Sequence, residues 1–145
     1  MQILLECGAD PSVQNDRGET PLHEALERDV PGSLDAVTLL VNAGTDMSRC
    51  TSYRETPLHL AARKNLPATV AMLLDKRAPP NAQDLRGNTA LHLAAGKGYR
   101  EVVRLLLAAP HVELNAQNKE GLTPLHIAVE SGFIKVVEVS ALYYY

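Results

Sequence analysis

Short apolar segments alternate with polar, glycine-containing segments along the whole chain. Leucine-rich apolar runs recur at residues 39–41, 72–74 and 105–107. Val102 and Val103 precede the last of these at a spacing that places one apolar face on a helix. Polar residues with a tendency to turn separate these segments from the next unit. The pattern predicts units of two short helices and a loop, none of which buries its apolar faces without its neighbours.

A four-residue signature marks the start of each unit. Thr-Pro-Leu-His occurs at residues 20–23, 56–59 and 123–126, and Thr-Ala-Leu-His occurs at residues 89–92, at spacings of 36, 33 and 34 residues. A threonine side chain accepts a backbone N–H at a helix N-cap, and proline fits the first helical position because its missing N–H has no partner there. Each signature therefore predicts the start of a helix.

Together these features resemble the ankyrin repeat family. Gly-Ala-Asp at residues 8–10, Asn-Ala-Gln-Asp at residues 81–84 and Asn-Ala-Gln-Asn at residues 115–118 also match the loops of that family. The resemblance covers essentially the whole chain and implies an all-α fold, a solenoid of antiparallel helix pairs with projecting β-turn loops. It implies a partial array of about four repeats with a leading half repeat.

We expect a single ankyrin-repeat domain over residues 1–145. Its predicted units are a partial repeat, a repeat with a three-residue insertion, two regular repeats and an atypical terminal repeat. They occupy residues 1–15, 16–51, 52–84, 85–118 and 119–145, respectively.

Three segments depart from the family pattern. Residues 29–33 contain the insertion, which predicts a longer loop between two helices. Arg54 stands where the family has glycine, and a side chain disfavours positive φ, so we expect a reshaped loop there. Arg-Ala-Pro-Pro at residues 77–80 replaces Gly-Ala-Asp and predicts a stiffer turn.

Both ends of the chain lack the polar capping face that terminal repeats normally carry. Residues 2–15 match the second helix and outgoing turn of a repeat without its first helix, which would leave Ile3 and Leu4 poorly packed. We therefore expect a fragment, or an unusual gene product, of a longer array. Alternatively, the tyrosines at residues 143–145 cap the last repeat with their rings.

Composition and charge narrow the function classes. The formal net charge of −3 offers no basic field for phosphates, so we expect no direct binding of nucleic acid. No apolar run approaches the roughly 20 residues needed to span a bilayer, so we expect no membrane partner. Cys7 and Cys50 lack paired or metal-ligand spacing. Reduced cysteines and the absence of a signal pattern predict a cytoplasmic or nuclear location.

The recurring histidines suggest a structural role. His23, His59, His92 and His126 occupy the same position in successive units, where the resemblance implies hydrogen bonds that tie adjacent turns together. Stacked units would hold them too far apart to share a metal ion. The acidic residues of the predicted helices have no nucleophile or oxyanion donor beside them. We predict no catalytic, cofactor-binding or metal-binding residue, no small-molecule substrate, and a protein that is not an enzyme.

A solenoid offers an extended concave surface for recognition. The resemblance implies that the loop tips and the exposed face of the first helices bind the partner. The candidate partner-binding residues are Arg17, Glu19, Arg28, Tyr53, Glu55, Arg63, Lys64, Leu85, Arg86, Asn88, Lys97, Lys119, Glu120 and Leu122.

The charge along this surface predicts the chemistry of the partner. The central repeats are basic through Arg54, Arg63, Lys64, Arg86 and Lys97. We expect a partner with an acidic segment that is steered by these charges more than it is held by them, because exposed ion pairs contribute only about 0–1 kcal/mol each. Tyr53 and Leu85 are the expected energetic anchors, since aromatic and apolar contacts dominate hot spots.

The function that best fits these features is a protein-interaction module of the scaffold or adaptor type. Two alternatives remain open. One is a small inhibitor that resembles the ankyrin proteins which mask transcription factors. The other is the targeting arm of a larger multidomain enzyme.

Overall fold

The computed structural model describes residues 2–28 and 32–142, which form helices and turns without a strand. In chain order the helices are α1 (Gln2–Glu6), α2 (Pro21–Glu27), α3 (Ser33–Asn42), α4 (Pro57–Arg63), α5 (Pro67–Asp75), α6 (Ala90–Lys97), α7 (Arg100–Leu107), α8 (Pro124–Glu130) and α9 (Ile134–Ala141).

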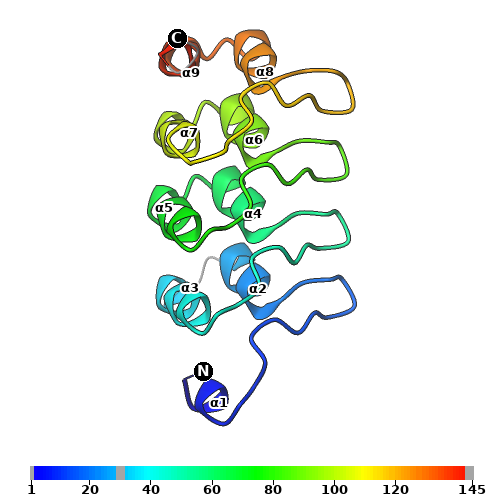
Figure 1. Ribbon diagram of the computed structural model, residues 1–145, viewed down its shortest axis with the longest axis vertical. Helices are drawn as coiled ribbons and strands as arrows, with labels where there is room; N and C mark the ends of the chain where they lie inside the picture. The colour runs from blue at the N-terminus through cyan, green and yellow to red at the C-terminus, as the bar shows by residue number, and fades with distance from the viewer. Residues whose placement is uncertain (1, 29–31, 143–145) are drawn as a thin grey trace.

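The helices form a stack of antiparallel pairs. In Figure 1 the first helices of the pairs, α2, α4, α6 and α8, form one column, and the second helices, α1, α3, α5, α7 and α9, form the other. A loop projects beside each first helix, on the side away from the second helices (Figure 1). Helix α6 packs against both α4 and α8, and α7 packs against both α5 and α9. The expected all-helical solenoid is therefore confirmed.

The first helices begin as the signature predicts. Thr20, Thr56, Thr89 and Thr123 are N-caps with extended backbones, and each side chain accepts a hydrogen bond from the backbone N–H three residues on. Proline follows the cap in α2, α4 and α8, where its fixed φ suits the first helical position.

The core consists of thin layers of leucine, valine and alanine. In α4, for example, Leu58, Leu60, Ala61 and Ala62 are all buried. Alanines on the first helices allow neighbouring pairs to approach closely, and leucines and valines of the second helices fill the space between layers. Buried apolar area of this kind stabilises by about 25 cal/mol per Å², and here it joins each pair to the next one.

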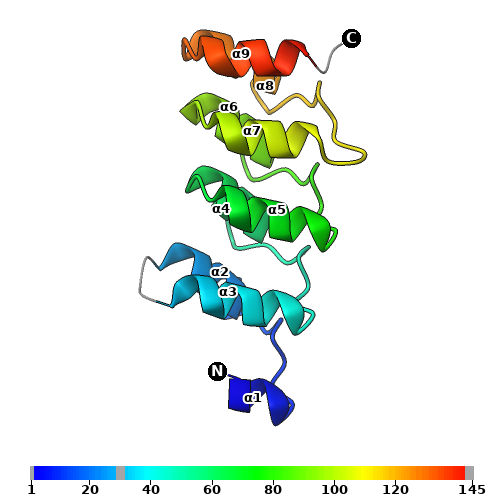
Figure 2. The same cartoon turned by 90° about the vertical axis from the view of Figure 1, so that its left-hand side faces the viewer.

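The two ends of the stack expose apolar side chains. Ile3 and Leu4 of α1 are 74% and 65% exposed, and α1 contains no buried residue, as the half repeat predicts. Figure 2 shows α1 below α3 as the last layer of that column. At the other end Val129, Ile134 and Leu142 are exposed. The proposed tyrosine cap at residues 143–145 lies outside the described residues.

The turns that depart from the family pattern keep regular helix ends. Arg77 takes the left-handed conformation at φ 64°, and Gly44 takes it at φ 83° at the matching position. The N–H groups of Arg77 and Ala78 bond to the carbonyls of Leu74 and Leu73, which closes the end of α5. The stiffness of this turn stays a prediction.

The connections between paired helices differ in length. Residues 28–32 separate α2 from α3, whereas residues 64–66 separate α4 from α5. Residues 29–31, which carry most of the predicted insertion, lie outside the described part of the chain. No helix in the part that the structure describes is long and apolar enough to cross a membrane.

Candidate functional site

The projecting loops share one internal geometry. We call residues 15–19, 51–55, 84–88 and 118–122 tips 1 to 4. In each tip, a side-chain oxygen of the first residue accepts the N–H groups two and four residues on. This residue is Asn15, Thr51, Asp84 or Asn118. Short polar side chains that bond their own turn fix its shape, so each tip is built locally.

Successive tips are joined by backbone hydrogen bonds. The N–H of Ser52 donates to the carbonyl of Arg17 at 2.8 Å, and the N–H of Leu85 donates to the carbonyl of Tyr53 at 3.0 Å. Lys119 bonds to Arg86 in the same way at 3.0 Å. The tips therefore form a continuous ladder, and residues at the same place in neighbouring tips lie side by side.

The expectation that Arg54 reshapes tip 2 is wrong. Arg54 adopts φ 59°, close to the 73° of Gly18 and the 77° of Gly87 at the matching positions. Its N–H donates to the carbonyl of Thr51 at 2.8 Å, as the N–H of Gly87 donates to that of Asp84. The hydrogen bonds of Thr51 and the ladder hold the tip in its usual shape. The left-handed conformation therefore strains the backbone of Arg54.

The signature histidines anchor the first helices to the following tip. The Nδ1 atoms of His23, His59 and His92 accept the backbone N–H of the preceding N-cap threonine, which completes a capping box. The Nε2 atoms lie 3.1, 2.9 and 3.0 Å from the carbonyls of Glu55, Asn88 and Leu122, respectively, in the next repeat. The expected structural role is confirmed for these three histidines.

Burial changes the acid–base behaviour of these histidines. Removal from water lowers the pKa of His23, His59 and His92, and the hydrogen bond to the next carbonyl only partly opposes the shift. They are therefore held neutral. Within the described part of the chain, no cluster of His, Cys, Asp or Glu has the composition to hold a metal ion.

A hollow lies between the tips and the first helices, and we call it the tip groove. It spans tips 1 to 3 and helices α2 and α4. It brings together half of the predicted partner-binding residues. Its lining includes Arg17, Glu19, Tyr53, Glu55, Arg63, Leu85 and Arg86, together with Glu27 and Leu60. Tyr53 is 69% exposed and Leu85 is 44% exposed, so both are open to a partner.

The other predicted residues lie outside the tip groove. Arg28 and Lys64 line an apolar hollow beside the connection between α2 and α3. Asn88 is engaged within the ladder, where its Oδ1 accepts a hydrogen bond from Asn118 at 3.0 Å. Lys97 ends α6, while Lys119, Glu120 and Leu122 belong to tip 4. They continue the same surface toward the C-terminal end of the stack.

The basic character of the central repeats is smaller than the sequence predicts. The Arg63 guanidinium lies 2.6 Å from Glu27 through Nη2 and 3.5 Å from Glu55 through Nε, the second distance being too long for a hydrogen bond. The Lys64 ammonium lies 3.3 Å from the same Glu27 carboxylate and donates to its backbone carbonyl. Both cations therefore link repeats, and much of their charge is neutralised.

Glu27 is the residue whose importance the sequence reasoning underrated. It precedes Arg63 by 36 residues, which is the spacing of the first two signatures. Opposite charges at equivalent positions of adjacent repeats face each other, and this spacing was the available signal. In tip 1, Arg17 is likewise paired with Glu19 at 2.9 Å and with Glu24 at 3.3 Å.

Comparison with known proteins finds ankyrin repeats along the chain. A family model described as ankyrin repeats in three copies matches residues 1–84, and one described as ankyrin repeats in many copies matches residues 73–128. A model of the single ankyrin repeat matches residues 120–139.

Two curated proteins are similar in sequence. Neurogenic locus notch homolog protein 2 of Homo sapiens is 36% identical over 104 residues, and so is the protein of the same name from Mus musculus. The aligned region covers 72% of this chain but only 4% of the length of either relative.

Proposed function

The chain belongs to the ankyrin repeat family, and from this premise we infer that it is an interaction module that binds a partner protein in the tip groove. Ankyrin repeats are generally modules for protein–protein interaction. The observation that carries the proposal is the meeting of Tyr53, Leu85 and Arg86 at the groove. Exposed aromatic and arginine side chains at the centre of a concave surface are typical of interaction hot spots.

We propose that the tip groove binds a partner and catalyses no reaction. Its acidic residues Glu27 and Glu55 are engaged by Arg63. The histidines nearest to it bond the backbone of the next repeat. These contacts link the side chains of the groove to one another and to the next repeat, so they support a shaped, pre-organised surface on which a partner is held.

An acidic segment is the partner feature that the charges favour. Arg54, Arg86, Lys97 and Lys119 are exposed, and no carboxylate within the described residues forms an ion pair with them. Such charges accelerate the encounter with an acidic surface and suppress wrong partners more than they add affinity.

We also place the module in the cytoplasm or nucleus. The Cys7 thiol is exposed, the Cys50 thiol is half-buried, and both are free. Unpaired thiols are usual in reducing compartments. Imaging of a fluorescent fusion of the chain tests this location, and accumulation in the secretory pathway would contradict it.

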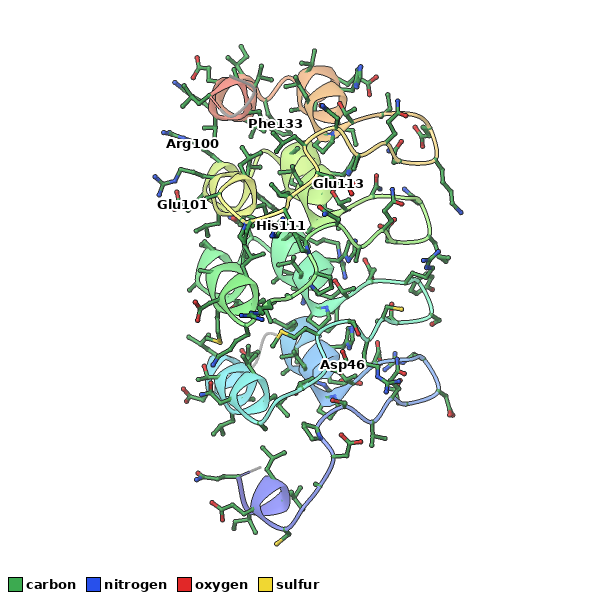
Figure 3. The ribbon with its side chains drawn as sticks, viewed as in Figure 1. Asp46, Arg100, Glu101, His111, Glu113 and Phe133 are labelled. Atoms are coloured by element: carbon green, nitrogen blue, oxygen red, sulfur yellow. The ribbon has the colours of Figure 1, made fainter. Side chains whose placement is uncertain are left out.

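Affinity capture with a matched pair of variants tests the binding role. The groove variant carries Tyr53→Ala, Leu85→Ala and Arg86→Ala. The control carries Arg100→Ala and Glu101→Ala, two side chains that point from α7 away from the tips (Figure 3). Arg63 and Lys64 are left intact because they join α4 to Glu27 of α2 in the preceding repeat.

We expect the wild type and the control to retain at least one protein that the groove variant loses, as measured by quantitative mass spectrometry. Thermal unfolding of all three chains checks that the stack is intact. A partner that the groove variant retains at full level, with the fold preserved, would show that the binding surface lies elsewhere.

A further inference from the structure

The level of the stack that contains α1 has an empty place. In Figure 1, α1 ends the column of second helices, and no first helix lies beside it. A hollow lies there, between α2, the start of α3 and the connection from α1 to tip 1. We call this hollow the open slot, and Val13, Pro21, Ala25 and Ala36 contribute apolar groups to its lining. It lies where the levels above it have a first helix.

The face of α2 at the open slot repeats a face that α8 buries. Pro124 and Ala128 are the first and fifth residues of α8, and both are buried. Helix α8 packs against α6, the first helix before it, and against α9. The matching residues of α2 are Pro21, which is exposed, and Ala25, which is half-buried. Helix α2 therefore presents a surface suited to a preceding helix, and no helix of the described residues covers it.

Helix α1 in turn exposes the side chain that would meet a first helix. Leu4, Leu40 and Leu73 match one another, because each carbonyl accepts the backbone N–H of the residue five positions on. Helices α3 and α5 pack against α2 and α4, and Leu40 and Leu73 are only 2% and 0% exposed. Leu4 has no first helix beside it and is 65% exposed. Leu4 therefore points toward the open slot of its own chain.

Helical geometry orients the neighbours of Leu4. Side chains two residues apart on an α-helix point about 200° apart. Leu5 is half-buried and α1 lies below α3 (Figure 2), so Ile3, on the opposite side of the helix, points away from the stack. By the same rule Glu6, the one charged residue of α1, points away from the open slot. The two sides of α1 that lack cover are therefore apolar.

A second copy of the chain can fill the open slot. A half turn about an axis parallel to α1, between the two columns of Figure 1, places α1 of an inverted copy in the open slot. The two α1 helices then share one level, and each lies between its own α3 and α2 of the other copy. At five residues, α1 is shorter than the seven-residue α2 and fits the length of that place. Because both copies use the same surface, the contact closes on itself as a dimer.

We propose that two copies of this chain form a symmetric dimer in which α1 of each copy occupies the open slot of the other. Leu4 of the two copies meets at the axis, and Ile3 of each copy packs on α2 of the other, against Pro21 and Ala25. The contact covers Leu4 and Ile3, which are 65% and 74% exposed in the single chain. Exposed apolar patches of this kind commonly mark interaction sites. The dimer gives α1 the packing that its own chain does not provide.

The charges at the rim of the open slot do not oppose the dimer. Glu24 is paired with Arg28 at 3.0 Å and with Arg17 at 3.3 Å, so its charge is balanced locally.

The dimer also leaves the tip groove accessible. Glu19 lines both the open slot and the tip groove, but Tyr53, Leu85 and Arg86 line only the groove. The dimer is therefore independent of the function proposed above, and either proposal can fail without the other.

The contact is small, which sets the concentrations at which it forms. Interfaces at the low end of the size range are weak and reversible. We expect the single chain, with α1 uncovered, at about 1 µM and mainly the dimer at about 200 µM, as for a dissociation constant of about 20 µM. Sedimentation velocity over this range of concentration measures both species.

A matched pair of variants tests which end of the stack is used. The N-end variant carries Ile3→Asp and Leu4→Asp. The C-end variant carries Ile134→Asp and Leu142→Asp, an isoleucine and a leucine that are 69% and 77% exposed at the other end. We expect the C-end variant to dimerise like the wild type. In the N-end variant the dissociation constant is expected to rise at least about 100-fold, because burial of an unpaired carboxylate is unfavourable.

A third variant, the slot variant, tests the open slot itself. Ala25→Arg places a long charged side chain in the slot and leaves α1 unchanged. Ala25 is half-buried at the surface, so the single chain accommodates the substitution. We expect the dissociation constant of the dimer to rise about ten-fold or more. Circular dichroism and thermal unfolding at low concentration check that all variants fold like the wild type.

Three results would overturn the proposal. One is a wild-type chain that stays monomeric at about 200 µM. Another is a dimer that survives unchanged in the N-end variant or in the slot variant. The third is loss of association in the C-end variant, or species larger than a dimer, since either would indicate end-to-end stacking through α8 and α9.

Discussion

Arg54 has a strained backbone conformation that the regular shape of tip 2 requires. It holds a left-handed backbone at φ 59°, at a place where tips 1, 3 and 4 have glycine. An L-residue in this conformation costs about 1–2 kcal/mol. A glycine at this position would remove that strain. Glycine loses about 0.5–1 kcal/mol more than alanine in conformational entropy on folding, however, and this loss would offset part of the gain.

We therefore expect Arg54→Gly to raise the free energy of unfolding by about 0.5–1 kcal/mol, because relief of strain exceeds the added entropy of the unfolded chain. Urea denaturation followed by circular dichroism measures this change. The same substitution removes an exposed positive charge from tip 2, so the more stable variant is also expected to bind an acidic partner more weakly. A loss of stability would contradict the idea that tip 2 is strained.

A glycine pair tests how closely the tips approach one another. Both Gly87 and Gly121 have φ 77°, so Gly→Ala imposes a similar backbone strain at each. A Cβ at Gly87 would lie 2.8 Å from the backbone nitrogen of Lys119, whereas a Cβ at Gly121 has no atom within 4 Å. We expect Gly87→Ala to destabilise the stack by about 1 kcal/mol or more beyond Gly121→Ala, because backbone atoms in the ladder must shift. Equal losses in urea denaturation would contradict close contact between tips 3 and 4.

At the residue scale, the sequence predicted properties of single positions better than contacts between residues of different repeats. It identified Arg54 as misplaced because glycine is required by one backbone angle, which is a local property. It did not predict that the tip keeps its shape, because that depends on the Thr51 hydroxyl and on the neighbouring tips. It likewise counted Arg63 and Lys64 as free charges, since their neutralisation by Glu27 requires the contact between two repeats.

At the scale of the helix, the N-cap threonine and the histidine three residues later act as one unit. In α4, Thr56 accepts the N–H of His59, and His59 accepts the N–H of Thr56. The second ring nitrogen of His59 reaches the carbonyl of Asn88. The same side chain therefore starts a helix and attaches it to the next tip. The signature predicted these helix starts because capping depends on residues close in sequence.

Burial of these histidines makes the stack sensitive to mild acid. Their pKa values are lowered in the folded state, from an unfolded value of 6.5. Above that value the imidazoles are neutral in both states. As the pH falls through it, the unfolded chain takes up protons that the folded chain does not, so stability declines. Each histidine contributes a slope of up to about 1.4 kcal/mol per pH unit.

We expect the free energy of unfolding to fall between pH 7 and pH 5, and to fall less steeply in His59→Gln. Glutamine at the third helical position can still form a capping box, so this variant removes the titrating group and retains a cap. Urea denaturation at pH 5, 6 and 7 measures both slopes. His126→Gln, which replaces an exposed histidine, is the control. Identical slopes in wild type and His59→Gln would argue against a protonation cost at this position.

At the scale of the whole molecule, stability comes from contacts between neighbours. Among the described residues, the main contacts between helices join each pair to the pairs before and after it, so the stack behaves as a one-dimensional array. The middle pairs have neighbours on both sides, whereas α1 has no buried residue. The repeat pattern predicted this architecture, because every unit repeats the same apolar faces. It also predicted a concave surface along the loop tips and first helices, but it did not predict the ion pairs between repeats that line the tip groove.

Hydrogen exchange is expected to follow this order along the stack. Amides of α4 and α6 should exchange most slowly and those of α1 fastest, because opening the middle breaks two interfaces and opening the end breaks one at most. Arg63→Ala removes the link from α4 to Glu27 in α2. Because exposed ion pairs contribute about 0–1 kcal/mol, exchange in α2 and α3 should then rise by up to about five-fold, while α8 and α9 stay unchanged. A uniform rise across all helices would mean that the stack opens as one cooperative unit, and that the repeats are coupled more strongly than nearest-neighbour contacts allow.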